Sequence, residues 1–300
     1  MTNTRSLGDQ VWTDLSSPSK EEVDSLVLAQ NIDPIIAKDL LSPTPKQYVK
    51  EFDNTIYAVL HIPSFKHSHA DGLEQEIDFI ITKKDLVTAR YDSIDALHLF
   101  AKQMEVKEIL NKNDYSHLFF GIMKEVYGFL FNEIDYIKDW IKEIEKKIFE
   151  GREKEMVFSI SSASRNILSF KRIMDPHQGV LFSLGCIGKN IFGEEFEKES
   201  KLLLEEWQRL NVETKNVSDM LDELRETNNS MLSTKQNEIM KQLAILGSIL
   251  LPLTIIGQLF GLSVRSFPLM NHPYAFWIIL SLMAVVMLIS VIYAKIKKWM

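Results

Sequence analysis

Residues 242–262, QLAILGSILLPLTIIGQLFGL, decide the architecture of this chain, because they contain no charged side chain. A second uncharged run, residues 274–294 (YAFWIILSLMAVVMLISVIYA), follows after the short segment 263–273. A helix needs about 20 apolar residues to cross the hydrocarbon core of a bilayer. We therefore predict a transmembrane helix over each run. Because the connecting segment is short, the two helices form a hairpin whose ends lie on the same side of the membrane.

Basic residues beside the two runs predict the orientation of the hairpin. Among lysines and arginines, the loop 263–273 contains Arg265 alone, whereas the other flanks carry more positive charge. These flanking residues are Lys235, Lys241, Lys295, Lys297 and Lys298. Since segments rich in Lys and Arg stay on the cytoplasmic side, the N-terminal part and residues 295–300 are expected there. The chain is then a multi-pass protein of the inner (cytoplasmic) membrane with both termini cytoplasmic.

Residues 1–241 form an acidic body with 30 basic and 41 acidic residues, a net charge of −11. Nucleic-acid binding is disfavoured, because contact with phosphates needs a basic surface. The single cysteine, Cys186, excludes a disulfide framework and a thiolate metal cluster, and its apolar surroundings predict a buried thiol. The sequence contains no recognisable nucleophile–base pair, phosphate loop or metallohydrolase histidine cluster. An enzyme is therefore not expected, nor is a covalently bound cofactor.

The first 195 residues mix strand and helix patterns, which predicts an α+β domain. Alternating β-branched runs at 55–62, 76–82 and 86–91 indicate strands, the last two joined as a hairpin. Apolar residues at helical spacing indicate helices over 93–110, 119–149 and about 154–174. We expect this mixed domain to occupy residues 1–195.

A long helical pattern begins near residue 196. Its seam steps by four and three residues through Leu203, Trp207, Leu210, Thr214, Val217, Leu221, Leu224, Asn228, Met231 and Lys235. Such a heptad repeat predicts packing along another helix. Residues 196–241 are interpreted as the cytosolic part of one stalk helix that continues into the first span. Sixty residues of it would extend about 90 Å. The alternative is an ordinary amphipathic helix in a core.

Polar and small residues recur on one face of the first span. Asn237, Gly247, Thr254 and Gln258 share this face at helical spacing. Such a stripe means either close helix packing or a water-lined path. Pro252 also deprives the Ser248 carbonyl of its usual hydrogen bond, which a wet lumen can replace. A path would require several copies around one axis, with the second helix facing lipid.

The sequence resembles the CorA family of divalent-cation channels, also called the two-transmembrane GxN family. The resemblance rests on the run NEIMKQLAILGSILLPLTIIGQLFGLSV (237–264), on Pro-Leu-Thr at 252–254, and on Lys-Lys-Trp at 297–299. It implies a homopentameric funnel whose stalk helices continue as the pore. The family's pore-lining positions correspond to Asn237, Met240, Leu243, Leu251 and Thr254, to which the stripe adds Gly247 and Gln258.

The resemblance also implies a role for each ring around the pore axis. Met240, Leu243 and Leu251 would form a hydrophobic gate that closes by dewetting. Asn237 would be the polar ring at the cytosolic mouth. The basic collar around the exit would consist of Lys295, Lys297 and Lys298.

The family signature Gly-Met-Asn (or Gly-Val-Asn) is replaced here by Gly261-Leu262-Ser263. In the family, the Asn carbonyl holds a divalent ion through its hydration shell, because Mg²⁺ releases its waters reluctantly. Ser263 offers a shorter hydroxyl and therefore a wider, weaker ring. The family loop often carries acids, whereas this loop contains Arg265 and no acid. Membership is thus better supported by the sequence than magnesium selectivity.

Carboxylates on the stalk are candidates for regulatory metal binding. The resemblance places one family position at Glu226 and another at Leu202; the nearby acids are Asp219, Asp222 and Glu223. A solvated acidic helix face is the alternative. His67, His69 and Asp71 could bind a transition metal or simply belong to a polar loop.

The leading hypothesis is a CorA-like homopentameric channel that passes divalent cations, Mg²⁺ by default, across the membrane. The metal ion is its substrate and a possible regulator. Its expected partners are other copies of the chain and the lipid bilayer, with no nucleic acid. One alternative is transport of Zn²⁺, Co²⁺ or Ni²⁺, or a less selective, even anion-tolerant, pore. A second is a non-conducting, membrane-anchored scaffold or metal sensor.

Overall fold

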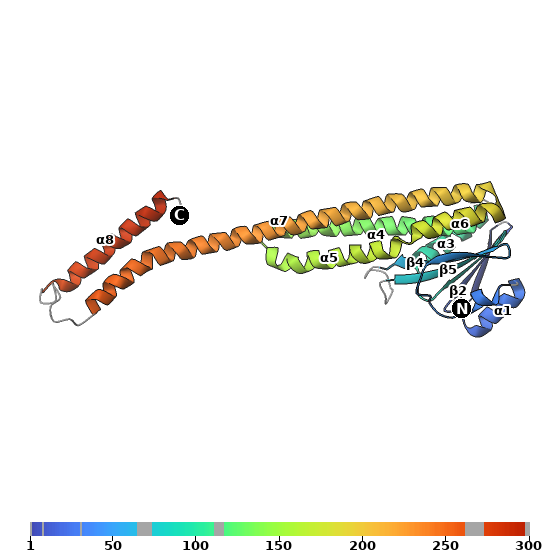
Figure 1. The fold of residues 1–300 in the computed structure, drawn as a ribbon, viewed down its shortest axis with the longest axis horizontal. Helices are drawn as coiled ribbons and strands as arrows, with labels where there is room; N and C mark the ends of the chain where they lie inside the picture. Colours follow the sequence, from blue (N-terminus) through green and yellow to red (C-terminus); the bar gives the residue numbers. More distant parts are fainter. Residues whose placement is uncertain are drawn as a thin grey trace. The chain divides into compact units, whose positions relative to one another are not determined.

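A computed structural model describes residues 2–7, 9–30, 32–64, 74–110, 117–261 and 273–297. The chain divides into two compact units, Met1–Arg225 and Glu226–Met300. The first unit contains a sheet and a helical bundle, and the second contains two apolar helical segments (Figure 1). The α+β domain, the long helix and the apolar C-terminal helix expected from the sequence are all present.

The sheet of the first unit has six strands in the order β1-β2-β6-β5-β4-β3. Neighbouring strands are antiparallel except β2 and β6, which are parallel. The strands are β1 (Thr2–Leu7), β2 (Gln10–Ser16), β3 (Tyr48–Phe52), β4 (Thr55–Pro63), β5 (Glu74–Ile81) and β6 (Asp85–Arg90). The three strands predicted from the sequence are confirmed as β4, β5 and β6, at the centre of the sheet.

Helices cover both faces of this sheet, so its central strands are buried on both sides. Helices α1 (Lys20–Gln30) and α2 (Pro34–Asp39) pack on the face that presents Val59 and Ile80. Successive strand residues point to opposite faces, and Phe79 therefore meets Phe119 of α4 on the other face, with ring centroids 5.1 Å apart. Helix α3 (Asp95–Leu110) also packs against α4.

Three helices continue the chain beyond α3. They are α4 (Leu118–Phe149), α5 (Glu153–Met174) and α6 (His177–Phe192), which confirms the predicted helices near 119–149 and 154–174. The turn between α4 and α5 uses Gly151 at φ +93°, a conformation that favours glycine. Ile144 and Ile148 belong to the buried stripe of α4, as their helical spacing predicted.

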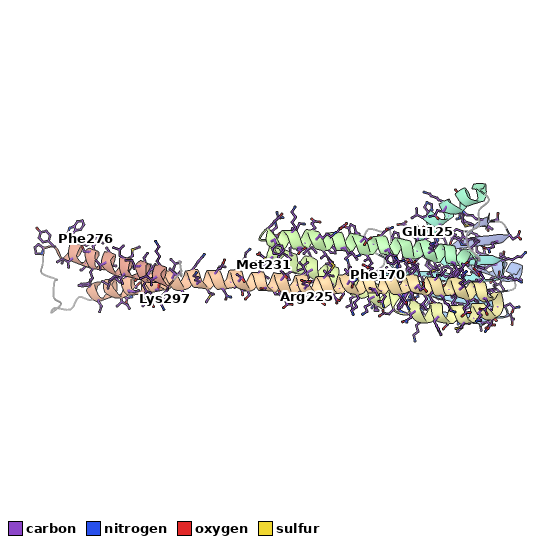
Figure 2. The ribbon with its side chains drawn as sticks, turned by 90° about the horizontal axis from the view of Figure 1, so that it is seen from above. Glu125, Phe170, Arg225, Met231, Phe276 and Lys297 are labelled. Atoms are coloured by element: carbon purple, nitrogen blue, oxygen red, sulfur yellow. The ribbon has the colours of Figure 1, made fainter. Side chains whose placement is uncertain are left out.

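Helix α7 (Glu194–Gly261) begins in the first unit and ends in the second. Its predicted seam is buried from Leu203 to Asn228, with every seam side chain at most 6% exposed, whereas Lys235 is exposed. Within the first unit the Trp207 indole donates to the Met174 carbonyl of α5 at 2.8 Å. Figures 1 and 2 both show α7 beside α4 in that unit. The heptad repeat therefore marks packing against the chain's own helices.

The prediction of a buried Cys186 was wrong, because this cysteine is exposed. The apolar run around it belongs to α6, an amphipathic helix that buries Val180 and Leu184. Cys186 lies on the outer face, four residues after the exposed Phe182. A continuous apolar run places apolar residues on both the buried and the exposed face of a helix. Composition alone therefore did not show which face contains Cys186.

The second unit holds the end of α7 and α8 (Ala275–Ile296). Both helices contain a window long and apolar enough to cross a membrane, with mean hydropathy 2.1 and 2.8. Figure 2 shows α8 returning along the last part of α7, with Phe276 and Lys297 at its opposite ends. Only 6% and 0% of the residues in these windows are buried, so most of the hairpin surface faces outward.

Candidate functional site

One face of the first span is less exposed than the others. The partly buried side chains of this span include Ile245, Ile249, Leu253, Ile256 and Phe260, which recur every three or four residues. The less exposed positions of α8 also form a single stripe: Ala275, Ile279, Met283, Val286, Ser290 and Ala294. Small residues at three of these positions let the two helices approach closely. We call these two stripes the hairpin seam.

The predicted pore-lining residues lie on another face of α7. Asn237, Met240, Leu243, Gly247, Leu251, Thr254 and Gln258 are all exposed. Met240, Leu243 and Leu251 have 65%, 57% and 62% of their surface exposed. At about 100° per residue, the centre of this stripe lies roughly opposite the hairpin seam. The arrangement therefore leaves the polar and small stripe uncovered by α8 and open to water or to other copies.

Polar groups near the uncovered stripe are held by the helix backbone. The Thr254 hydroxyl donates to the Leu250 carbonyl at 2.7 Å, and the Ser248 hydroxyl donates to the Ile245 carbonyl at 2.8 Å. Each hydroxyl donates its hydrogen to a backbone carbonyl. Its oxygen keeps lone pairs that can accept hydrogen bonds from water. Pro252 lies inside the helix and provides no N–H for the Ser248 carbonyl. The stripe thus offers acceptor oxygens, which suit a hydrated cation.

The signature region lies mostly outside the described residues. Gly261 is the last residue of α7, whereas Leu262, Ser263 and Arg265 fall in the segment 262–272, which the structure does not describe. In the predicted basic collar, Lys295 and Lys297 are exposed, and Lys298 lies outside the described residues.

The candidate regulatory acids lie exposed on α7. Asp219, Asp222 and Glu223 belong to the first unit, where Asp222 accepts a hydrogen bond from Arg225 at 3.0 Å. Glu226 is also exposed and belongs to the second unit. No group of three or more His, Cys, Asp or Glu side chains in the described part of the chain could hold a metal ion. His67, His69 and Asp71 lie outside that part.

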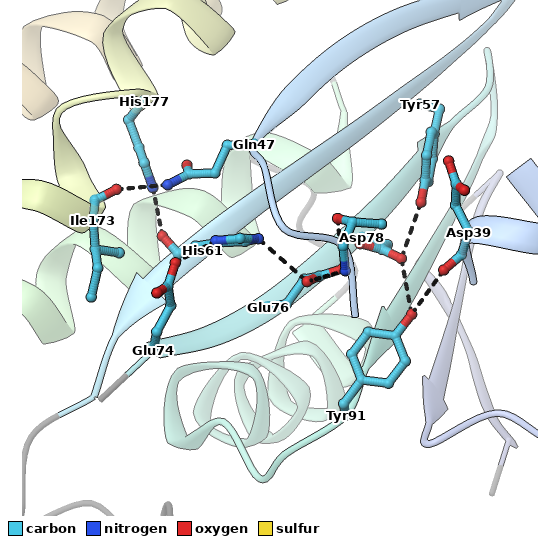
Figure 3. Close-up of polar contacts among 11 residues, drawn as sticks. Asp39, Gln47, Tyr57, His61, Glu74, Glu76, Asp78, Tyr91, Ile173 and His177 are labelled. Carbon is cyan, nitrogen blue, oxygen red and sulfur yellow. Dashed lines mark hydrogen bonds and ion pairs between the residues drawn. The ribbon is translucent and has the colours of Figure 1, made fainter. Parts of the chain in front are cut away.

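A buried polar network in the first unit was missed by the sequence analysis (Figure 3). It joins His61 of β4 to Glu74, Glu76 and Asp78 of β5, and continues to tyrosine hydroxyls. The pattern Glu-Gln-Glu-Ile-Asp at 74–78 was the available signal, because alternate residues of a strand share one face. This run was assigned to a strand and its acids were given no role, whereas Glu76 and Asp78 are buried.

Comparison with known proteins covers nearly the whole chain. A family model described as "CorA-like Mg2+ transporter protein" matches residues 8–296. The cobalt/magnesium transport protein CorA of Thermotoga maritima is 23% identical over 270 residues, which cover 90% of this chain and 77% of that protein. The protein of the same name from Methanocaldococcus jannaschii is 24% identical over 302 residues, covering 96% and 91% of the two chains.

The fold is also similar to a solved structure. The complete structure of the CorA magnesium transporter from Methanocaldococcus jannaschii superposes with a TM-score of 0.84 at 20% identity. The superposition covers 97% of this chain and 92% of that one. The superposition therefore includes residues of both units, and the likeness concerns the fold alone.

Proposed function

The chain belongs to the CorA-like Mg2+ transporter family, and from this premise we propose that it is a homopentameric channel for divalent metal cations. Mg²⁺ is the default substrate, and the channel lies in the cytoplasmic membrane with both termini cytoplasmic. Relatives named as cobalt/magnesium transport proteins support this substrate class. The protein is a transporter and not an enzyme.

The observation that carries the proposal is the uncovered stripe on the first span. Five copies that turn this stripe toward a common axis would stack its residues into rings. Leu251, Leu243 and Met240 would form hydrophobic constrictions that gate by dewetting. Thr254 and Gln258 would supply oxygen acceptors to the hydration shell of the ion. A membrane potential of 100 mV would then drive each divalent cation with about 4.6 kcal/mol.

The choice of ion depends on the signature residues. Ser263 in place of the family Asn gives a wider and weaker ring, and Arg265 adds positive charge near it. Both features favour, as the second candidate, transport of Zn²⁺, Co²⁺ or Ni²⁺, or a less selective pore. The double variant Ser263→Asn, Arg265→Glu should raise Mg²⁺ flux if these two residues limit it.

Flux into proteoliposomes tests the proposal directly. Purified pentamer is reconstituted with a Mg²⁺-sensitive dye, and then with a Zn²⁺-sensitive dye, with and without an inside-negative potential. We expect potential-driven influx, and the ratio of the two ions identifies the preferred substrate. An intact pentamer that passes neither ion would refute the channel and favour a membrane-anchored sensor or scaffold.

A matched pair of variants locates the path. Leu251→Trp fills a proposed constriction and should abolish flux. Leu288→Trp makes the same change on the exposed face of α8, where 61% of the leucine is accessible, and should leave flux unchanged. Equal flux in both variants would place the ion path elsewhere.

A further inference from the structure

The buried network on β4 and β5 takes no part in the ion path. In the sheet register, His61 stands opposite Glu76, and the His61 side chain is 8% exposed. Its Nδ1 contacts Glu74, and its Nε2 lies 3.3 Å from Oε2 of Glu76. Burial alone lowers the pKa of His61, but the two carboxylates outweigh burial and raise it. The imidazole therefore lies between two carboxylates that favour its protonated form.

Asp78 forms the inner end of the network. Its side chain is fully buried, and Oδ2 accepts hydrogen bonds from the hydroxyls of Tyr57 at 3.1 Å and Tyr91 at 3.4 Å. Within the described residues, Oδ1 has no hydrogen-bond partner. Burial first, and then the negative charge of Glu76, raise the pKa of Asp78 well above its ordinary value. Asp78 is therefore a buried carboxyl whose surroundings favour its protonated form.

Glu76 connects His61 and Asp78 to the segment between α2 and β3. Both of its carboxylate oxygens accept from the Thr44 backbone N–H, at 2.8 and 2.9 Å, and Oε1 also accepts from the Thr44 hydroxyl. Three residues later, the Gln47 amide donates to the Ile173 carbonyl at 2.7 Å. The next carbonyl, of Met174, binds the indole of Trp207 on α7. Hydrogen bonds and short stretches of backbone therefore connect Glu76 to the helix that continues into the first span.

Other ionisable groups border the network on each packed element. Asp39 of α2 accepts from Tyr48 and from Tyr91, through its carboxylate and its backbone carbonyl respectively. On α6, His177 contacts the His61 carbonyl at 2.8 Å, and burial lowers its pKa to about 4, so it stays neutral. At the outer end, Lys46 and Arg172 line a cavity of about 490 Å³ together with His61 and Glu74. This cavity gives protons a route to solvent.

We propose that Asp78, Glu76 and His61 form a proton-controlled latch on the segment 40–47. While both groups keep their protons, the His61 imidazolium compensates the charge of Glu76, Asp78 adds no charge, and Glu76 holds Thr44. Loss of either proton to solvent leaves uncompensated negative charge beside Glu76, which weakens the latch and frees the segment that binds α5. The consequence for transport, that cytosolic pH sets how firmly α5 holds Trp207, rests on the proposed function.

The sign of the pH effect follows from the two raised pKa values. The stabilisation from His61 is complete below about pH 6.5 and is lost as pH rises through the raised value of the folded protein. The stabilisation from protonated Asp78 is likewise complete below its ordinary pKa and declines as pH rises. Both groups therefore open the latch toward alkaline pH.

Hydrogen exchange on the full chain in detergent tests the latch. Protection of the Thr44 amide is compared between about pH 6 and 9, after correction for the intrinsic exchange rate. We expect the protection factor of the wild type to fall about tenfold for each pH unit above the pH at which half of the latches are open. Asp78→Asn keeps a neutral group beside Glu76 with no proton to lose, so only His61 can still open the latch and protection should fall less than in the wild type. Asp92→Asn, an exposed control, should behave as wild type.

A second variant keeps the test decisive if Asp78→Asn does not fold. Tyr91→Phe removes one hydrogen bond that favours the Asp78 carboxylate, and should move the opening midpoint to higher pH. A midpoint unchanged by Tyr91→Phe, or equal loss of protection in wild type and Asp78→Asn, would overturn the latch.

Flux separates the latch from the proposed function. In proteoliposomes with the cytosolic domain outside, we expect wild-type metal flux to differ at least about twofold between pH 6.5 and 8.5, and flux through Asp78→Asn to differ less. A wild-type protein without flux at any pH refutes the channel, and exchange still decides the latch. The same pH dependence of flux in both proteins refutes the link from latch to α7.

Discussion

The two parts of α7 use apolar residues in opposite ways. From Leu203 to Asn228 the helix buries a single seam against its own chain and presents charged residues elsewhere. From Met240 to Gln258 it is apolar nearly all round, and most side chains are exposed. Helices that are hydrophobic all round are typical of a buried or membrane environment. The first part is therefore stabilised by contacts that one chain provides, whereas in the proposed channel the second part would depend on lipid and on further copies.

The largest expected effect comes from removing the tryptophan of the buried seam. Trp207 is 5% exposed, and Trp207→Ala leaves a cavity there and removes the hydrogen bond to the Met174 carbonyl. We therefore expect the unfolding free energy to fall by about 3–5 kcal/mol. Leu243→Ala, in the exposed part of the same helix, should cost less than about 1 kcal/mol. Thermal and denaturant unfolding in detergent measures both. Similar losses would mean that the two parts are not stabilised differently.

The second largest effect is expected at low pH, which should destabilise the first unit more than the second. Burial lowers the pKa of His117 to about 4, and the Phe119 N–H donates to its Nδ1 at the start of α4. A lowered histidine pKa gives stability above about pH 6.5 that is lost as pH falls toward 4, here about 3 kcal/mol. His177 should add a similar loss. Circular dichroism should show the first unit unfolding while the hairpin keeps its helices.

A control variant tests the origin of this acid sensitivity. Asn is a good helix N-cap without a titrating proton, so His117→Asn should retain α4 and remove this residue's share of the pH dependence. An unchanged acid transition in the variant would assign the sensitivity to other groups.

The hairpin seam gives the third effect. Ala294 is 1% exposed, so Ala294→Leu overfills the contact between the two spans and should destabilise the hairpin by about 1–3 kcal/mol. Val285→Leu adds a similar side chain at a position that is 52% exposed and should have almost no effect. Thermal stability of the detergent-solubilised protein compares them, and equal shifts would argue against close packing at Ala294.

The smallest effect concerns an ion pair between α4 and α7. Lys138 donates to Glu213 at 2.7 Å, and both side chains are partly exposed. Glu213→Gln should therefore cost less than about 1 kcal/mol, and added salt should reduce the difference. A loss of several kcal/mol would show that charge pairs, rather than the apolar seam, hold α7 in the first unit.

Much of the fold could be predicted because its signals are local. The β-branched runs of β4, β5 and β6 and the heptad seam of α7 depend on spacing within one element. The hairpin β1–β2 was missed, because its polar sequence is mixed and β2 pairs in parallel with β6, about 70 residues away. Helix α6 was missed because the helical spacing of its buried residues was not recognised within a continuous apolar run.

The candidate site divides in the same manner. Helical spacing predicted the stripe from Asn237 to Gln258, but which face α8 covers depends on a contact between two elements. The network of His61 and Asp78 could not be recognised from single residues, because carboxylates in strands usually face water. The segment 40–47 reaches the network only in the folded chain, where the Thr44 N–H donates to Glu76.

The boundary at Arg225 also has a consequence for biosynthesis. Every residue of the first unit is translated before the first span, and domains fold as units, N-terminal part first, at about 5–20 residues per second. The 75 residues of the second unit then take about 4–15 s to add. The acidic domain can therefore fold beside the ribosome before insertion begins. In the proposed topology, only the loop 263–273 must be translocated, so insertion never requires passage of a folded domain.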